Sequence, residues 1–238
     1  MLLGLAAAGW VVFLRQARQP MDMGPEMMMG PDLTMGRSWP LFFAMWVAMM
    51  TAMMFPAAAP MIVMYGRMKR GDTLAVTLFT ASYIALWFAF GGLAFLLGAG
   101  VEIAASRSEW VSMNWARAGG ALIVFAGVYQ LTPLKDVCLQ HCRTPMAFVM
   151  NHWRDGRVGA ARMGSVHGLY CMGCCWPLFL ILIPVGVMNV AAMASVALVI
   201  FVEKVMPWGR GFGRVAAIGL ITYGVLVVLR PELLPTVA

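Results

Sequence analysis

The amino-acid sequence predicts an all-α protein, a polytopic transmembrane bundle of six to seven helices. Of its 238 residues, 62% are hydrophobic and 11% are charged, and the mean hydropathy is +0.81. Soluble domains have about 45–50% apolar and about 25% charged residues. A soluble chain of this length could not bury so much apolar surface. The apolar residues also gather in stretches close to the ~20 residues that span a bilayer.

Seven stretches approach that length: 1–14, 39–64, 74–98, 117–133, 163–186, 188–206 and 213–230. We interpret the first as a short transmembrane helix or an N-terminal anchor, because no small-x-small cleavage site follows it. The connection at 186–190 allows only a tight turn, so the fifth and sixth stretches should be antiparallel neighbours. The chain then divides into an N-terminal helix with a methionine-rich loop (1–38), a transmembrane bundle (39–230) and a C-terminal tail (231–238).

The basic residues predict the orientation of the bundle. Of the 17 Lys and Arg residues, 11 lie in the loops at 65–72, 134–162 and 204–214, and six lie on the opposite side. Cytoplasmic loops carry an excess of Lys and Arg, so the N-terminus should be inside and the C-terminus outside. Because the net charge of +7 is spread over short loops, it does not indicate nucleic-acid binding. The expected partner is the lipid bilayer.

Methionine is unusually frequent, with 23 residues in the chain. The segment 21–35 has no helical or strand period, contains six methionines and three carboxylates, and faces the outside on this topology. Thioethers are soft, neutral ligands that suit Cu(I) in an oxidising compartment. The segment is therefore either a site that collects metal or a flexible apolar linker on the lipid surface.

The second stretch carries further methionines on one side of its expected helix. They form two i, i+4 stripes, with Met45, Met49 and Met53 on one and Met50 and Met54 beside it. Pro56 removes a backbone donor and should kink or unwind this helix near its middle. Methionine also fills irregular gaps in packed cores, so the stripes are explained either by metal contact or by packing.

The most concentrated candidate site lies in the fifth stretch. A helix would place four side chains on one face, those of His167, Cys171, Cys174 and Cys175. Gly164 and Gly168 lie beside that face and would let a neighbouring helix come close. Polar groups at membrane depth are costly without partners, which makes the cluster a functional-site hypothesis. Thiolates and an imidazole suit Cu(I) or Zn(II). The C-x-x-C spacing of Cys171 and Cys174 also fits thiol–disulfide exchange, and plain helix packing is a third explanation.

A second group of soft donors precedes the fifth stretch and consists of Cys138, His141 and Cys142. The three would share a face if their segment is helical. They could exchange an ion with the fifth stretch, or they could be structural residues at the membrane surface.

Two charged residues, Glu203 and Lys204, end the sixth stretch. We expect them to mark the membrane boundary by snorkelling, or Glu203 to pair with a loop arginine such as Arg143 or Arg162. The sequence has no phosphate-binding loop, Ser-His-Asp set, paired catalytic carboxylates or nucleotide fingerprint, which argues against an energised pump that works alone and gives no positive indication of an enzyme.

Several motifs occur together in this chain: Met45-Trp-x-Ala-Met-Met-x-Ala-Met-Met-x-Pro56, Ala126-Gly-Val-Tyr-Gln-Leu-Thr-Pro-Leu-Lys135, Cys138-Leu-x-x-Cys142-Arg-x-Pro145, Gly164-x-x-x-Gly-x-x-Cys-x-Gly-Cys-Cys-Trp176, Gly186-Val-Met-Asn189 and Glu203-Lys204. The combination resembles a family of bacterial integral membrane proteins described as metal-binding and sometimes labelled copper chaperones. The resemblance covers about residues 39–210. It implies association with a metal and a location in the bacterial inner membrane, and it does not extend to the segment 21–35.

We therefore expect a membrane-embedded protein that binds a soft metal, Cu(I), with zinc as the alternative, and that acts in copper delivery or retention, for instance for a copper enzyme. Residues 21–35 would collect the ion, the methionine stripes would relay it, and Cys171, Cys174 and Cys175 with His167 would hold it. Two alternatives stay open. The chain could be a non-catalytic accessory subunit of a larger membrane oxidoreductase or monooxygenase, packed against other membrane subunits, or a membrane thiol–disulfide oxidoreductase.

Overall fold

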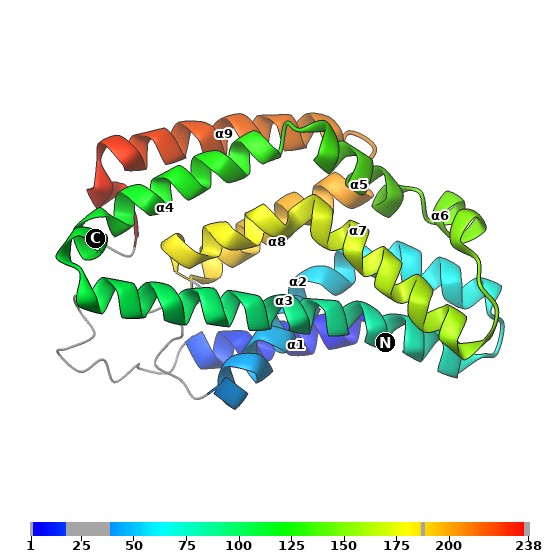
Figure 1. The fold of residues 1–238 in the computed structure, drawn as a ribbon. Helices are drawn as coiled ribbons and strands as arrows, with labels where there is room; N and C mark the ends of the chain where they lie inside the picture. Colours follow the sequence, from blue (N-terminus) through cyan, green and yellow to red (C-terminus); the bar gives the residue numbers. More distant parts are fainter. Residues whose placement is uncertain (1, 18–38, 187–188, 236–238) are drawn as a thin grey trace.

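The computed structural model describes residues 2–17, 39–186 and 189–235 (Figure 1). The described residues form helices and no strand, so the all-α prediction is confirmed. In chain order the helices are α1 (Leu2–Ala17), α2 (Trp39–Met68), α3 (Thr73–Arg107), α4 (Glu109–Tyr129), α5 (Pro133–Arg143), α6 (Pro145–His152), α7 (Gly156–Val185), α8 (Val190–Val205), α9 (Gly209–Leu229) and the short 3-10 helix η2 (Pro231–Leu233). The methionine-rich segment 21–35 lies outside the described residues.

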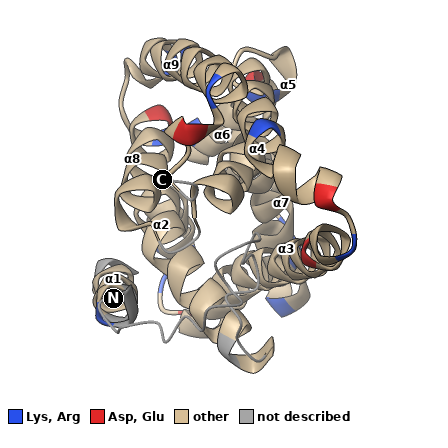
Figure 2. Cartoon of the chain, turned by 90° about the vertical axis from the view of Figure 1, so that its left-hand side faces the viewer, with Lys and Arg blue, Asp and Glu red and all other residues tan. Residues whose placement is uncertain are grey.

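Within the described ranges, five helices are long and apolar enough to cross a membrane: α2, α3, α4, α7 and α9. The helices α1 and α8 have 16 residues each and are shorter than the rest of this set. Figure 2 shows few Lys, Arg, Asp or Glu residues along the ribbon. These long apolar helices indicate a membrane protein.

All seven predicted stretches contain a helix, but the segment 134–162 is not the loop that we expected. It contains most of α5, all of α6 and the first turns of α7. The α5 helix begins at a strong start signal, because the Thr132 side chain accepts a hydrogen bond from the Lys135 amide and Pro133 occupies the first turn. Leu139 and Cys142 of α5 are buried, and Cys138 lies against Gly173 in the middle of α7.

The connections between helices fall at opposite ends of the molecule. In Figure 1 the α2–α3, α6–α7 and α8–α9 connections lie toward the right, and the α3–α4 connection and η2 lie toward the left. The right-hand group contains the basic loops that the sequence analysis placed together on one side of the membrane.

Small residues bring two helix pairs into close contact. An added Cβ on Gly120 of α4 would lie 2.9 Å from the Gly224 carbonyl oxygen of α9, and Figure 1 shows these helices side by side. On α7, an added Cβ at Gly164 would overlap the Phe79 carbonyl oxygen of α3, and one at Gly168 would lie 2.7 Å from Leu86 Cδ1. The close approach predicted for Gly164 and Gly168 is therefore confirmed, and its partner is α3.

The α2 helix carries its methionines into the core. It remains helical through Pro56 and Pro60, so the unwinding that we allowed for at Pro56 does not occur. Trp46 Nε1 donates to the Trp87 carbonyl oxygen at 2.8 Å and joins α2 to α3. All four inner methionines, Met49, Met50, Met53 and Met54, are at most 3% exposed. They belong to the same buried cluster as the three α7 cysteines.

The α7 and α8 helices are neighbours, as the short connection predicted, and a side-chain hydrogen bond joins them. Gly186 follows α7 with a φ of +101°, a conformation that favours glycine. Asn189 caps α8, because its side chain accepts from the Ala192 amide at 3.0 Å. Residues 187 and 188 lie outside the described residues.

Candidate metal centre

One face of α7 presents the predicted cluster to the interior. The four side chains of this face are between 1% and 2% exposed: His167, Cys171, Cys174 and Cys175. The helical spacing thus placed them correctly, and their face is turned toward protein. All five cysteines of the chain are free thiols.

Three helices meet at the sulfur of Cys171. Lys204 of α8 donates from Nζ to Cys171 Sγ at 2.8 Å, and the hydroxyl of Tyr83 on α3 lies 3.0 Å from the same sulfur. Both partners are buried. An ammonium group beside a cysteine sulfur favours the thiolate, which is the form that binds soft metals. Cys171 is therefore the centre of the site.

The burial of Lys204 corrects the expectation that Glu203 and Lys204 snorkel at a membrane boundary. Glu203 is 2% exposed and Lys204 is 7% exposed. The physical reason is tertiary, since α5 and the start of α9 cover the end of α8. An added Cβ on Gly213 would overlap the Glu203 carboxylate, and Arg143 of α5 binds backbone oxygens at the same helix end.

Three further thiols lie around Cys171. Cys174 Sγ and Cys175 Sγ donate to the Cys171 carbonyl oxygen at 3.0 Å and 2.8 Å. Cys142 of α5 lies beside Cys171 and Cys174. Hydrogen bonds to these two residues, together with burial, raise the pKa of the Cys142 thiol well above its ordinary value. Four thiols from two helices thus gather in one buried region.

No three His, Cys, Asp or Glu side chains in the described ranges are arranged so that they could hold a metal ion together. Structural zinc takes four such ligands in a tetrahedron, and nothing in the arrangement supports zinc. Cu(I) can be bound by a small number of soft ligands, including thioethers. The thiol pairs beside Lys204, with neutral methionines in the same core, fit this softer and lower coordination.

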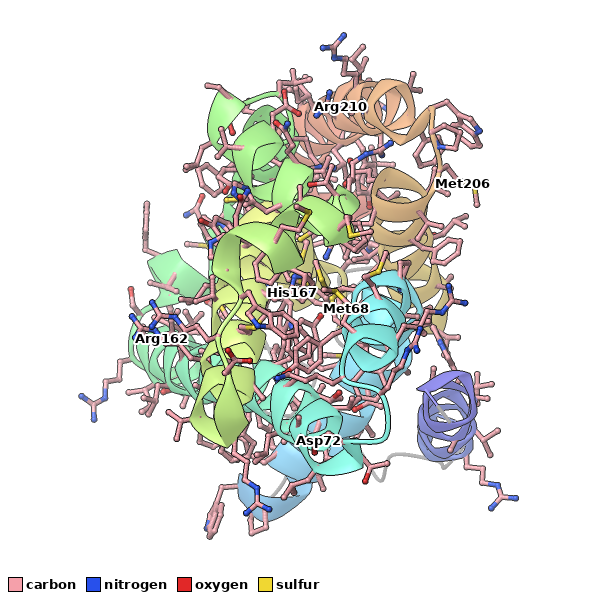
Figure 3. The ribbon with its side chains drawn as sticks, turned by 90° about the vertical axis from the view of Figure 1, so that its right-hand side faces the viewer. Met68, Asp72, Arg162, His167, Met206 and Arg210 are labelled. Atoms are coloured by element: carbon pink, nitrogen blue, oxygen red, sulfur yellow. The ribbon has the colours of Figure 1, made fainter. Side chains whose placement is uncertain are left out.

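His167 lies one helical turn from Cys171, and neither ring nitrogen has a hydrogen-bond partner within the described structure. Its ring is stacked near Phe79 and Tyr83, with centroids 6.1 Å and 5.6 Å away, and Phe148 meets it edge-on. Figure 3 shows His167 near the middle of the molecule, whereas Arg162 and Arg210 lie at its periphery. Burying an imidazole without hydrogen-bond partners costs free energy. The unpartnered ring nitrogens of His167 are therefore consistent with a role as a metal ligand.

The group on α5 is helical, as its shared face required, but its three donors separate. Cys138 Sγ lies against α7, only 2.8 Å from where a Cβ of Gly173 would be, and burial raises the pKa of its thiol. Cys142 reaches the α7 cysteines. His141 instead stacks on Tyr170 with ring centroids 4.0 Å apart, and its Nδ1 lies 2.9 Å from the Val137 carbonyl oxygen. Cys142 is thus the α5 residue that joins the cluster.

A buried ion pair holds α5 beside the cluster. Lys135 Nζ lies 2.6 Å from Glu203 Oε1, with both side chains at most 3% exposed, and Gln130 Nε2 donates to the same oxygen at 3.1 Å. The expected pairing of the Glu203 carboxylate with Arg143 or Arg162 is therefore wrong. Arg143 instead donates to backbone carbonyl oxygens at the end of α8, those of Glu203 and, at 2.8 Å, Met206.

Sequence reasoning missed the three residues that position Cys171 and its surroundings, namely Lys204 as a thiol partner, Tyr83 as a second partner and Lys135 as the partner of Glu203. A usable signal existed for Lys204. It lies at the end of an apolar stretch, and a charged residue at membrane depth must have a partner.

One methionine of the α2 stripes, Met49, reaches α7 at a small cavity. Met49 and Trp46 line this cavity with Phe179 and Ile183 of α7. Met49 thus meets α7 one to two turns beyond Cys175 in the chain direction. The buried face of α2 therefore adjoins α7, the helix that carries the thiols, at this cavity.

Comparison with known proteins identifies the family. A family model named PpoB2 and described as a copper chaperone matches residues 43–227, a range that contains all the thiols, Lys204 and the buried methionines of α2. No curated protein and no solved structure matches the chain. Because the match extends over most of the sequence, with copper in its description and soft donors buried at its centre, this chain belongs to the PpoB2 family of copper chaperones.

Proposed function

We propose that this chain binds Cu(I) within the membrane and delivers or retains it there. The observation that carries this proposal is the environment of Cys171, a buried sulfur with an ammonium group at 2.8 Å and three further thiols around it. Such a charge-matched thiol cluster is costly in an apolar core. Its chemistry suits a soft monovalent ion, and the copper-related family supports the same function.

The residues divide into two groups, those that would bind the ion and those along which the ion would reach the binding residues. Cys171 would hold the ion with Cys174 or Cys142, since these thiols lie beside it. His167, one turn from Cys171 and with both ring nitrogens unpartnered, would join these ligands after a side-chain rearrangement, because no three such side chains of the described residues are arranged to hold an ion together. The buried methionines of α2 form the route by which the ion reaches the thiols, because thioethers bind Cu(I) without needing to lose a proton. Residues 21–35 would collect it outside, and the basic loops would face the cytoplasm.

The proposal is tested by the copper content of the full chain purified from membranes. The triple variant Cys171→Ala, Cys174→Ala and Cys175→Ala should lose most of the copper retained by the wild type after washing, because Ala cannot replace a thiolate bond. Cys138→Ala is the matched control, since this thiol lies against Gly173. It should retain wild-type copper.

Membrane levels of each variant are measured in parallel so that loss of protein is not counted as loss of metal. Unchanged copper in the triple variant would contradict the proposal. It would favour an accessory subunit in which the thiols serve only as small packing groups.

A further inference from the structure

We propose that Lys204 is a built-in counter-cation that makes the thiol site select a singly charged soft ion over divalent ions. This inference rests on the proposed function and adds a residue that determines specificity. It begins from a residue that is not itself a proposed ligand, since Lys204 donates from Nζ to Cys171 Sγ at 2.8 Å.

Lys204 and Cys171 form a hydrogen-bonded pair in the core. Lys204 is 7% exposed and Cys171 is 1% exposed. The nearest other buried charges, Lys135 and Glu203, neutralise each other at 2.6 Å. Arg143 approaches the same region, but its guanidinium binds backbone oxygens at the partly exposed end of α8. Lys204 thus supplies the positive charge that the thiol cluster itself experiences.

The number of thiolates follows from the proposed ligands. The proposed function places the ion between two thiolates, that of Cys171 with that of Cys174 or Cys142. Among the described residues, no three His, Cys, Asp or Glu side chains are arranged to hold an ion together. Methionine sulfur and neutral imidazole add no charge to that count.

The charge balance then decides which ion the core accepts. Two thiolates, one monovalent ion and the Lys204 ammonium sum to zero. A divalent ion in the same place leaves one net positive charge in a region from which water is excluded, which is strongly unfavourable. Without the lysine the preference reverses, since the monovalent complex becomes negative and the divalent complex becomes neutral.

The experiment compares monovalent and divalent probes on the full chain in detergent under reducing conditions. Ag(I) and Cd(II) are the main probes, because both are soft and differ in charge, and Cu(I) and Zn(II) repeat the comparison. Affinities are measured by competition with chelators of known strength. The wild type should bind Ag(I) more tightly than Cd(II), and Lys204→Met should lower the ratio of the two affinities at least tenfold.

Two variants separate charge from structure. Lys204→Arg keeps the positive charge, on a planar guanidinium instead of an ammonium, and should keep the ratio much closer to that of the wild type than Lys204→Met does. Lys69→Met removes a lysine away from the cluster, whose ammonium lies 3.5 Å from the exposed Asp155 carboxylate. It should leave the ratio unchanged.

The possible outcomes test the specificity inference and the proposed copper binding separately. If Lys204→Met keeps the wild-type ratio while its cysteines still bind metal, Lys204 does not determine specificity, although copper binding stands. If the wild type binds neither Ag(I) nor Cu(I) through its cysteines, the proposed function fails. If Lys204→Met does not accumulate, the wild type decides alone, because binding of Cd(II) at least as tight as that of Ag(I) overturns the inference.

Discussion

Gly164→Ala should destabilise the protein, because α7 touches the backbone of α3 at this residue. The added Cβ would overlap the Phe79 carbonyl oxygen and Ser82 Oγ, and it would lie 2.8 Å from the Phe79 carbonyl carbon. Real Cβ atoms essentially never approach other atoms within 3.0 Å. The opposing atoms are mostly backbone, which cannot rotate away as a side chain can, so the two helices must move apart.

The expected magnitude follows from two opposing terms. Overpacking in a well-packed core costs about 1–3 kcal/mol, and a rigid backbone contact favours the upper part of that range. Replacing Gly by Ala inside a helix contributes about 0.5–1 kcal/mol in the stabilising direction. We expect a net loss of about 1–2 kcal/mol. Copper retention should also fall, because Tyr83, one turn beyond Phe79, contacts Cys171.

The assay is thermal unfolding of the purified protein in detergent, with bound copper measured on the same samples. Gly219→Ala is the matched control, since an added Cβ there would meet nothing within 4 Å. This control should be as stable as the wild type or slightly more so. The reasoning is refuted if Gly164→Ala and Gly219→Ala unfold at the same temperature.

Two further predictions concern buried polar groups. Lys135→Met should lower the free energy of unfolding by about 3–5 kcal/mol, because it leaves Glu203 buried without its lysine partner, and adding Glu203→Gln should recover most of that loss. A double-mutant cycle in detergent measures the coupling between the two residues. Additive effects would contradict the importance of the pair. His167→Phe should raise the unfolding temperature, since it removes two unsatisfied nitrogens worth about 1–3 kcal/mol, and should lower copper content; a stabilised variant with full copper would exclude His167 as a ligand.

Local pattern was sufficient for the helices and for the face of α7 that carries the thiols. Helical spacing alone places His167, Cys171 and Cys175 together, and the cost of polar groups without partners at membrane depth implies that this face is turned toward protein. Gly164 and Gly168 predicted a close helix neighbour, because only a residue without a side chain allows that approach. These features depend on residues within a few turns of each other, where the sequence order is also the spatial order.

The partners of the thiols depended on the tertiary structure. Lys204 and Cys171 are 33 residues apart, and Tyr83 and Cys171 are 88 apart, so no local spacing relates them. A Glu-Lys pair at a helix end has the same sequence whether it snorkels into water or is buried. Burial is decided by what other helices place over that end. Here α5 folds back across α8, brings Lys135 to Glu203, and leaves the Lys204 ammonium with a cysteine sulfur as its partner.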